Sequence, residues 1–135
     1  MNMSGLVLLN VLFKNIFSPL QWFALILVSM LGIDLGLIIF NPEIAWYVGF
    51  SGVLHGIIAV VSLMLILNHG VKGAGMLILL LFKLIWEQLS GPLPGTEDWT
   101  GGAVITEAHL YGAISGGIFF IFGAVSSSIW EKRPG

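Results

Sequence analysis

The chain has 135 residues, of which 57% are hydrophobic and only 9% are charged, and its formal net charge is −2. Soluble domains carry about 25% charged residues, so this composition indicates a membrane protein surrounded by lipids. The sequence contains no cysteine, which excludes disulfides, thiolate metal ligands and a cysteine nucleophile. It also has no basic cluster, so we expect no nucleic-acid partner.

One short apolar stretch is followed by four longer ones. The short stretch covers 6–17, and the longer ones cover 20–40, 46–67, 71–86 and 105–130. Most of them approach the ~20 residues that a helix needs to cross a hydrocarbon core about 30 Å thick. No segment alternates in the way of barrel strands, and backbone groups need internal partners in lipid, so the spans should be helices. We predict an all-α membrane protein: one polytopic helical bundle over 1–135 with five spans.

Turn signals separate these spans along the chain. The segment 41–43, Asn-Pro-Glu, ends the second span, because proline lacks an N–H and disfavours helix in the residue before it. The next helix should begin close to Ser51. The segment 68–70, Asn-His-Gly, predicts a helix end with glycine in the left-handed cap. The segment 89–102 is rich in proline and glycine and is expected to be a loop on the outer face.

Basic residues gather on one side of the membrane if the helices alternate: Lys14, Lys72, Lys132 and Arg133. The positive-inside rule makes that side cytoplasmic and places the N-terminus outside. Residues 1–5 carry no charge, which argues against a secretory signal peptide. Because an outside start without a signal is unusual in a five-span protein, we expect a further span upstream of Met1.

The stretch GFSGVLHG at 49–56 contains the first candidate site residue, Ser51. A serine in the first turn of a helix lies among N–H groups without intrahelical partners, at the positive end of the helix dipole, where an oxyanion is stabilised. The flanking Gly49 and Gly52 would let a substrate backbone come close. A packing role remains an alternative, since Ser51 could cap the helix while Gly52 and Gly56 form a GxxxG-type pair.

A second stretch carries His109 on a face of small residues. Gly112, Ala113 and Gly116 follow it by three, four and seven positions and therefore share its helix face. Helices with such stripes approach closely, which could bring His109 against Ser51, since both lie at the outer ends of their helices. An ionisable residue inside a membrane is by default a functional hypothesis, and a single structural hydrogen bond is the alternative.

Other polar residues in the spans are weaker candidates for a functional role. His55, one helical turn below Ser51, is a rival base, but we favour a supporting role for it because residues four apart on one helix have limited freedom to exchange a proton in line. Lys83 and Glu87 form an i,i+4 pair that neutralises itself, and we interpret it as structural. Asp34 stands alone in the second span and could point into the bundle, with an open role.

Together these motifs resemble the rhomboid intramembrane serine proteases. That family has GxSG at the start of one span, as at 49–52, and a histidine followed by a glycine at the start of the last, as at 109–112. The stretches 46–56 and 83–96, with the Glu-Ala-His at 107–109, resemble rhombosortase, a bacterial rhomboid subfamily.

The resemblance implies a Ser–His dyad without an aspartate. Ser51 would attack the scissile carbonyl of a membrane segment, and His109 would take its proton and pass it to the leaving amine. The Ser51 backbone N–H would contribute to the oxyanion hole. Rhomboids have six core spans, and an asparagine in their second span helps to bind the oxyanion. If Asn2 is that asparagine, a partner histidine and a whole first span lie upstream of Met1.

The subfamily also implies a substrate and a location. The substrates would be exported proteins with a C-terminal tail made of a Gly-Gly motif, one apolar helix and a basic end. The enzyme would lie in the bacterial inner membrane, open to the periplasm, without a metal or other cofactor. Transfer of the product to a lipid-derived group is left open. Alternatives are an impaired pseudoprotease that binds membrane segments, a haem protein ligated by His55 and His109, and a transporter gated by Glu87 or Asp34.

Overall fold

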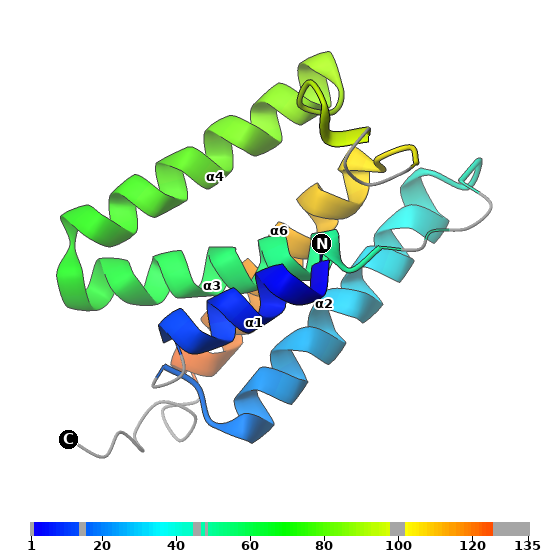
Figure 1. The fold of residues 1–135 in the computed structure, drawn as a ribbon. Helices are drawn as coiled ribbons and strands as arrows, with labels where there is room; N and C mark the ends of the chain where they lie inside the picture. Colours follow the sequence, from blue (N-terminus) through cyan, green and yellow to red (C-terminus); the bar gives the residue numbers. More distant parts are fainter. Residues whose placement is uncertain (1, 14–15, 45–46, 48, 98–101, 126–135) are drawn as a thin grey trace.

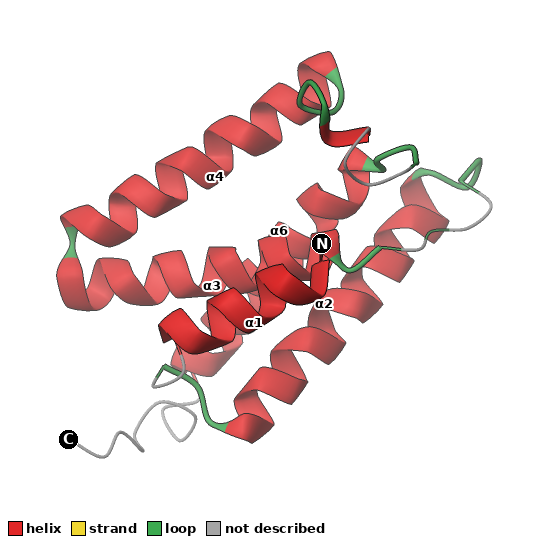
Figure 2. Ribbon diagram, in the orientation of Figure 1, coloured by secondary structure: helices red, strands yellow, loops and turns green. Residues whose placement is uncertain are grey.

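The computed structural model describes residues 2–13, 16–44, 47, 49–97 and 102–125. Their regular secondary structure is entirely helical (Figure 2), which confirms the predicted all-α class. The five helices are α1 (Asn2–Phe13), α2 (Pro19–Phe40), α3 (Ser51–His69), α4 (Val71–Ser90) and α6 (Thr106–Val125).

Helix α1 lies four residues before the predicted first span, which was wrong at both ends. The reason is the start of α2, where Ser18 and Gln21 form a capping box. The Ser18 N–H donates to Gln21 Oε1 at 2.7 Å, and the Gln21 N–H donates to Ser18 Oγ at 3.3 Å. Pro19 then occupies the first turn, where its missing N–H costs nothing. The extended Ser18 backbone requires the chain to leave α1 before this point.

Three of the predicted helix boundaries are confirmed. Helix α2 ends at Phe40, α3 begins at Ser51, and α3 ends at His69 with Gly70 in the left-handed region at φ 42°. The predicted loop 89–102 begins too early, because α4 continues to Ser90. Its second half, 76–90, contains no proline or glycine, and the helix ends at Gly91 with a φ of 79°.

Helix α3 is the centre of the bundle (Figure 1). It packs most extensively against α6 and also against α4, α2 and α1. The main core lies between these helices and contains large apolar side chains: Leu25, Ile33, Val53, Ile57, Val60, Val61 and Met64. Successive helices run in opposite directions. One side of the bundle therefore holds the ends of α2 and α4 together with the beginnings of α3 and α6.

Three helices are long and apolar enough to cross a membrane within the described part of the chain: α2, α3 and α4. They make the chain a multi-pass membrane protein. Helix α1 is shorter, at 12 residues. Helix α6 opens with Thr106, Glu107 and His109, and the end of the predicted fifth span at 126–130 lies outside the described residues. Of the basic residues used for orientation, the structure describes only Lys72, which lies next to the α3–α4 turn.

Candidate active site

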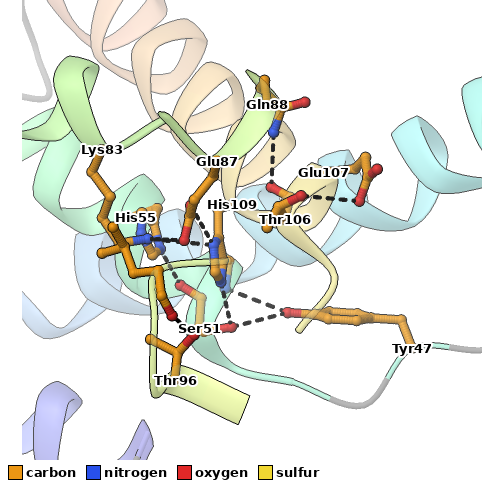
Figure 3. A network of polar contacts seen from close by, with 12 residues as sticks. Tyr47, Ser51, His55, Lys83, Glu87, Gln88, Thr96, Thr106, Glu107 and His109 are labelled. Carbon is orange, nitrogen blue, oxygen red and sulfur yellow. Dashed lines mark hydrogen bonds and ion pairs between the residues drawn. The ribbon is translucent and has the colours of Figure 1, made fainter. Parts of the chain in front are cut away.

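Ser51 is the first residue of α3, and its side chain faces a histidine from another helix. The Ser51 Oγ lies 3.0 Å from Nε2 of His109, which is 4% exposed in the first turn of α6 (Figure 3). The two residues are 58 positions apart in the sequence. The structure therefore brings together the serine and histidine that the sequence predicts as a pair, at a distance suited to proton transfer.

Glycines allow α3 and α6 to approach closely enough for this contact. A Cβ on Gly112 would overlap the carbonyl oxygen of Gly52, and a Cβ on Gly116 would overlap that of Gly56. A Cβ on Gly52 would in turn lie 2.5 Å from the Ala108 carbonyl oxygen. These are contacts with backbone, which moves less easily than side chains. The glycines therefore have the packing role considered above, and the same α3–α6 interface brings Ser51 next to His109.

The other ring nitrogen of His109 contacts a carboxylate. Glu87, in the last turn of α4 and 2% exposed, places Oε2 at 2.8 Å from His109 Nδ1. Its Oε1 accepts a hydrogen bond from Lys83 Nζ at 2.6 Å. The expected Lys83–Glu87 pair is therefore confirmed, but it is not self-contained, because Glu87 also contacts His109.

His55 lies against the face of the His109 ring. The two ring centroids are 4.1 Å apart and the planes differ by 16°, so the rings are stacked. His55 Nδ1 lies 2.7 Å from the Ser51 carbonyl oxygen, which can only accept, so Nδ1 donates. The sequence left His55 open as a rival base, but this ring nitrogen is directed at the Ser51 backbone and not at its hydroxyl.

Tyr47 brings a hydroxyl to the other side of Ser51. Its oxygen lies 3.5 Å from Ser51 Oγ and accepts from the Gly52 N–H at 3.4 Å. The ring also lies over Gly49, where a Cβ would be 2.7 Å from the Tyr47 hydroxyl oxygen. The Ser51 hydroxyl therefore has the Tyr47 hydroxyl and the His109 imidazole as neighbours (Figure 3).

Comparison with known families shows which family the chain belongs to. The rhomboid domain model matches residues 1–127, nearly the whole chain. The chain belongs to the rhomboid family. Rhomboids are in general intramembrane serine proteases, although the family includes pseudoproteases. Searches of curated proteins and of solved structures found no match.

Two further residues were predicted from the sequence, Asp34 and Asn2, and neither has a described contact with Ser51 or His109. Asp34 does not point into the bundle as expected: it is exposed on α2 and borders a groove of about 300 Å³ that Tyr47, Gly49 and Phe50 also line. Asn2 begins α1, but its side chain lies outside the described part of the structure. Its role in the oxyanion hole stays a prediction, as does the upstream span.

The site also offers a set of possible metal ligands. His55, Glu87 and His109 each place one ligand atom within 4.8 Å of the others. In this structure these groups form hydrogen bonds within the protein, and the Lys83 ammonium contacts Glu87, where a metal cation would have to compete with it. The stacked, nearly parallel imidazoles are also unsuited to holding a haem iron from its two faces, which argues against that alternative.

Sequence reasoning missed two residues that the structure places next to Ser51 and His109, namely Glu87 and Tyr47. For Glu87 the signal was present, since a carboxylate inside an apolar span marks a functional hypothesis. It was set aside because Lys83 at i−4 offered a partner. Tyr47 lies four residues before Ser51 in an irregular segment, where no helical spacing predicts which way its ring turns.

Proposed function

We propose that the chain is a rhombosortase-like serine endopeptidase acting through Ser51 and His109. The observation that carries this proposal is the 3.0 Å separation of Ser51 Oγ and His109 Nε2 at the first turns of two closely packed helices, α3 and α6. A serine hydroxyl is a weak nucleophile until a base removes its proton. An imidazole such as that of His109 can act as this base, and membership of the rhomboid family supports the same assignment.

The reaction follows from the two contacts. As Ser51 Oγ bonds to the scissile carbonyl carbon, its proton passes to His109 Nε2 and the carbonyl π electrons move to the oxygen. When the tetrahedral intermediate collapses, the C–N bond breaks and His109 returns the proton to the leaving amine. Water then attacks the acyl-serine by the same route in reverse, and Ser51 is restored.

The oxyanion would lie at the start of α3. Backbone N–H groups of a first helical turn have no partner within the helix and point outward along its positive end. The Ser51 N–H is the first of these, with the Gly52 N–H and the Tyr47 hydroxyl beside it. In the family pattern Asn2 would add a further donor, and His55 would support the site through the Ser51 carbonyl.

The substrate class is the C-terminal Gly-Gly sorting tail of exported proteins. The stretches 46–56 and 83–96, which resemble rhombosortase, support this substrate class. The reacting groups lie at the ends of α3, α4 and α6 opposite to the α3–α4 turn, next to which Lys72 lies. With basic residues inside, the site of this single rhomboid-like domain would face the periplasm from the bacterial inner membrane.

A fluorophosphonate probe tests the proposal, because it labels only serines activated by a base. Protein purified in detergent should be labelled, and labelling should vanish in Ser51→Ala and fall severely in His109→Ala. His55→Ala should keep part of it. Circular dichroism would establish that each variant is folded.

Labelling of Ser51→Ala at the wild-type rate, or of a folded His109→Ala at that rate, would contradict the proposal. Loss of labelling in His55→Ala alone would assign the base to His55. A folded wild-type protein that takes up no probe would support the pseudoprotease alternative instead.

A further inference from the structure

Glu87 is a buried carboxylate with each oxygen assigned to a different partner. Oε2 contacts His109 Nδ1 at 2.8 Å, and Oε1 contacts Lys83 Nζ at 2.6 Å (Figure 3). The residue is 2% exposed, and a buried charge is costly unless it is paired and hydrogen-bonded. Lys83, with its side chain 29% exposed, supplies that pairing from the preceding turn of α4.

The Lys83 contact decides the state of the carboxylate and, through it, the state of the imidazole. An ammonium 2.6 Å away favours the ionised form of Glu87. An ionised carboxylate only accepts hydrogen bonds, so His109 Nδ1 must carry the hydrogen and donate it. The neutral ring then has an unprotonated Nε2, and this is the atom that faces the Ser51 hydroxyl.

His55 cannot supply the same control. It stacks on the face of the His109 ring and so restrains the plane of that ring, but it forms no hydrogen bond with either of the ring nitrogens within the described contacts. A stacked ring leaves both tautomers of His109 possible. Two groups reach Nδ1 among the described contacts: Glu87 Oε2 at 2.8 Å and Lys83 Nζ at 3.5 Å. The carboxylate contact is much the shorter of the two, and it is the one that favours hydrogen on Nδ1.

We infer that Glu87 is a positioning residue, which makes the site a Ser51–His109–Glu87 arrangement with Lys83 behind it, where the family pattern has a dyad alone. This inference rests on the proposed function. Glu87 holds the reactive tautomer of His109 and stabilises the imidazolium that forms when Ser51 attacks. It takes up no proton itself: the proton moves from Ser51 Oγ to His109 Nε2 and then to the leaving amine.

The test is Glu87→Gln, which keeps the size of the side chain but can donate its amide hydrogens to Nδ1 and stabilise the wrong tautomer. With a fluorophosphonate probe, we expect the maximal inactivation rate to fall by about 10²- to 10⁴-fold while the probe's half-saturating concentration changes little. Glu107→Gln removes a carboxylate from the first turn of α6, where it contacts Thr106, and should react like wild type.

A spectroscopic measurement separates positioning from general support of the fold. In protein with ¹⁵N-labelled histidine, His109 should show a protonated, strongly hydrogen-bonded Nδ1 in wild type. Glu87→Gln should lose that signal, and Glu87→Asp should regain part of both the signal and the rate. A purely structural role for Glu87 would leave the tautomer of the folded variant unchanged.

The double variant Lys83→Met/Glu87→Leu covers the case in which Glu87→Gln fails to fold. Removing a whole buried ion pair is often tolerated where removing one member is not. We expect the folded double variant to react with the probe at least 10²-fold more slowly than wild type.

Wild-type reactivity in either folded variant would overturn the role of Glu87, and the proposed function would stand as long as Ser51→Ala and His109→Ala remain unlabelled. If Ser51→Ala were labelled like wild type, the proposed function itself would fail. The two failures are therefore distinguishable.

Discussion

Helices α3 and α4 are neighbours of similar length, 19 and 20 residues, but they contribute to the site in different ways. Over an apolar stretch of 18 residues in each helix, 56% of the α3 residues are buried inside the bundle, against 22% of those in α4. Helix α3 holds Ser51 through backbone contacts with α6 that only glycine permits. Helix α4 faces outward along most of its length and reaches His109 through two side chains, the buried Glu87 at 2.8 Å and Lys83 at 3.5 Å.

This difference predicts two kinds of sensitivity. A site fixed by backbone contact is disrupted by any added atom, because no side chain can turn away to accommodate it. A site fixed by one ion pair tolerates changes in the surrounding helix but responds to a change of charge. Steric substitutions should therefore be most harmful on the α3–α6 contact, and charge substitutions on the inner face of α4.

Gly112→Ala should have the largest effect on the α3–α6 contact. The added methyl would overlap the Gly52 carbonyl oxygen, and overpacking of this kind costs about 1–3 kcal/mol of stability. Separating the helices by ~1 Å also misplaces His109 relative to Ser51, which we expect to lower probe labelling about 10²-fold. Thermal unfolding in detergent and the rate of labelling measure the two effects.

Gly117→Ala is the matched control on the same helix, since nothing lies within 4 Å of a Cβ at that position. Its unfolding temperature and its rate of labelling should match those of wild type. Equal behaviour of Gly112→Ala and Gly117→Ala would show that the close approach of α3 and α6 does not position the site.

The sequence is informative about α3 and α6 because their signals are local. Gly52 and Gly56 on one helix, and Gly112 and Gly116 on the other, repeat every four residues, and this spacing predicts a close helix pair from each segment alone. The serine and histidine then meet because each lies at the outer end of its helix. That is why Ser51 and His109 could be named together before the structure was known.

The contribution of α4 is less accessible to sequence reasoning. The partner of Glu87 depends on how α4 turns relative to α6, which is set by packing across the bundle and not by spacing within one segment. The i,i+4 contact with Lys83 is local and was predicted, whereas the contact with His109 spans 22 positions and was not. Similarly, the boundary between α1 and α2 depends on the Ser18 capping box, whose backbone requirement outweighs hydropathy.

Lys83→Met should have an intermediate effect and tests the α4 side of the comparison. It removes the ammonium from Glu87 Oε1 while keeping an unbranched chain of similar length. Hydrogen bonds to charged groups contribute about 1.5–3 kcal/mol, and partial exposure of Lys83 reduces this, so we expect about a tenfold slower reaction with the probe.

Lys83→Arg keeps the positive charge and should recover most of the rate. Lys83→Met leaves the buried Glu87 without its ammonium partner and should lower the unfolding temperature, whereas Lys83→Arg should keep it close to that of wild type. If Lys83→Met reacted at the wild-type rate, the charge behind Glu87 would have no bearing on His109.

Tyr47→Phe should have the smallest effect and asks whether the irregular segment before α3 adds to what the helices provide. The change removes only the hydroxyl that lies 3.5 Å from Ser51 Oγ and accepts from the Gly52 N–H. A neutral hydrogen bond contributes about 0.5–1.5 kcal/mol, which corresponds to a loss of about 2- to 10-fold in the rate of labelling.

Tyr111→Phe is a matched control, because it deletes a hydroxyl that donates to Asn41 Oδ1 at 2.6 Å, in a contact that does not include Ser51. The rate should fall in Tyr47→Phe and not in Tyr111→Phe. Equal rates in the two variants would assign the positioning of Ser51 to the helix contacts alone.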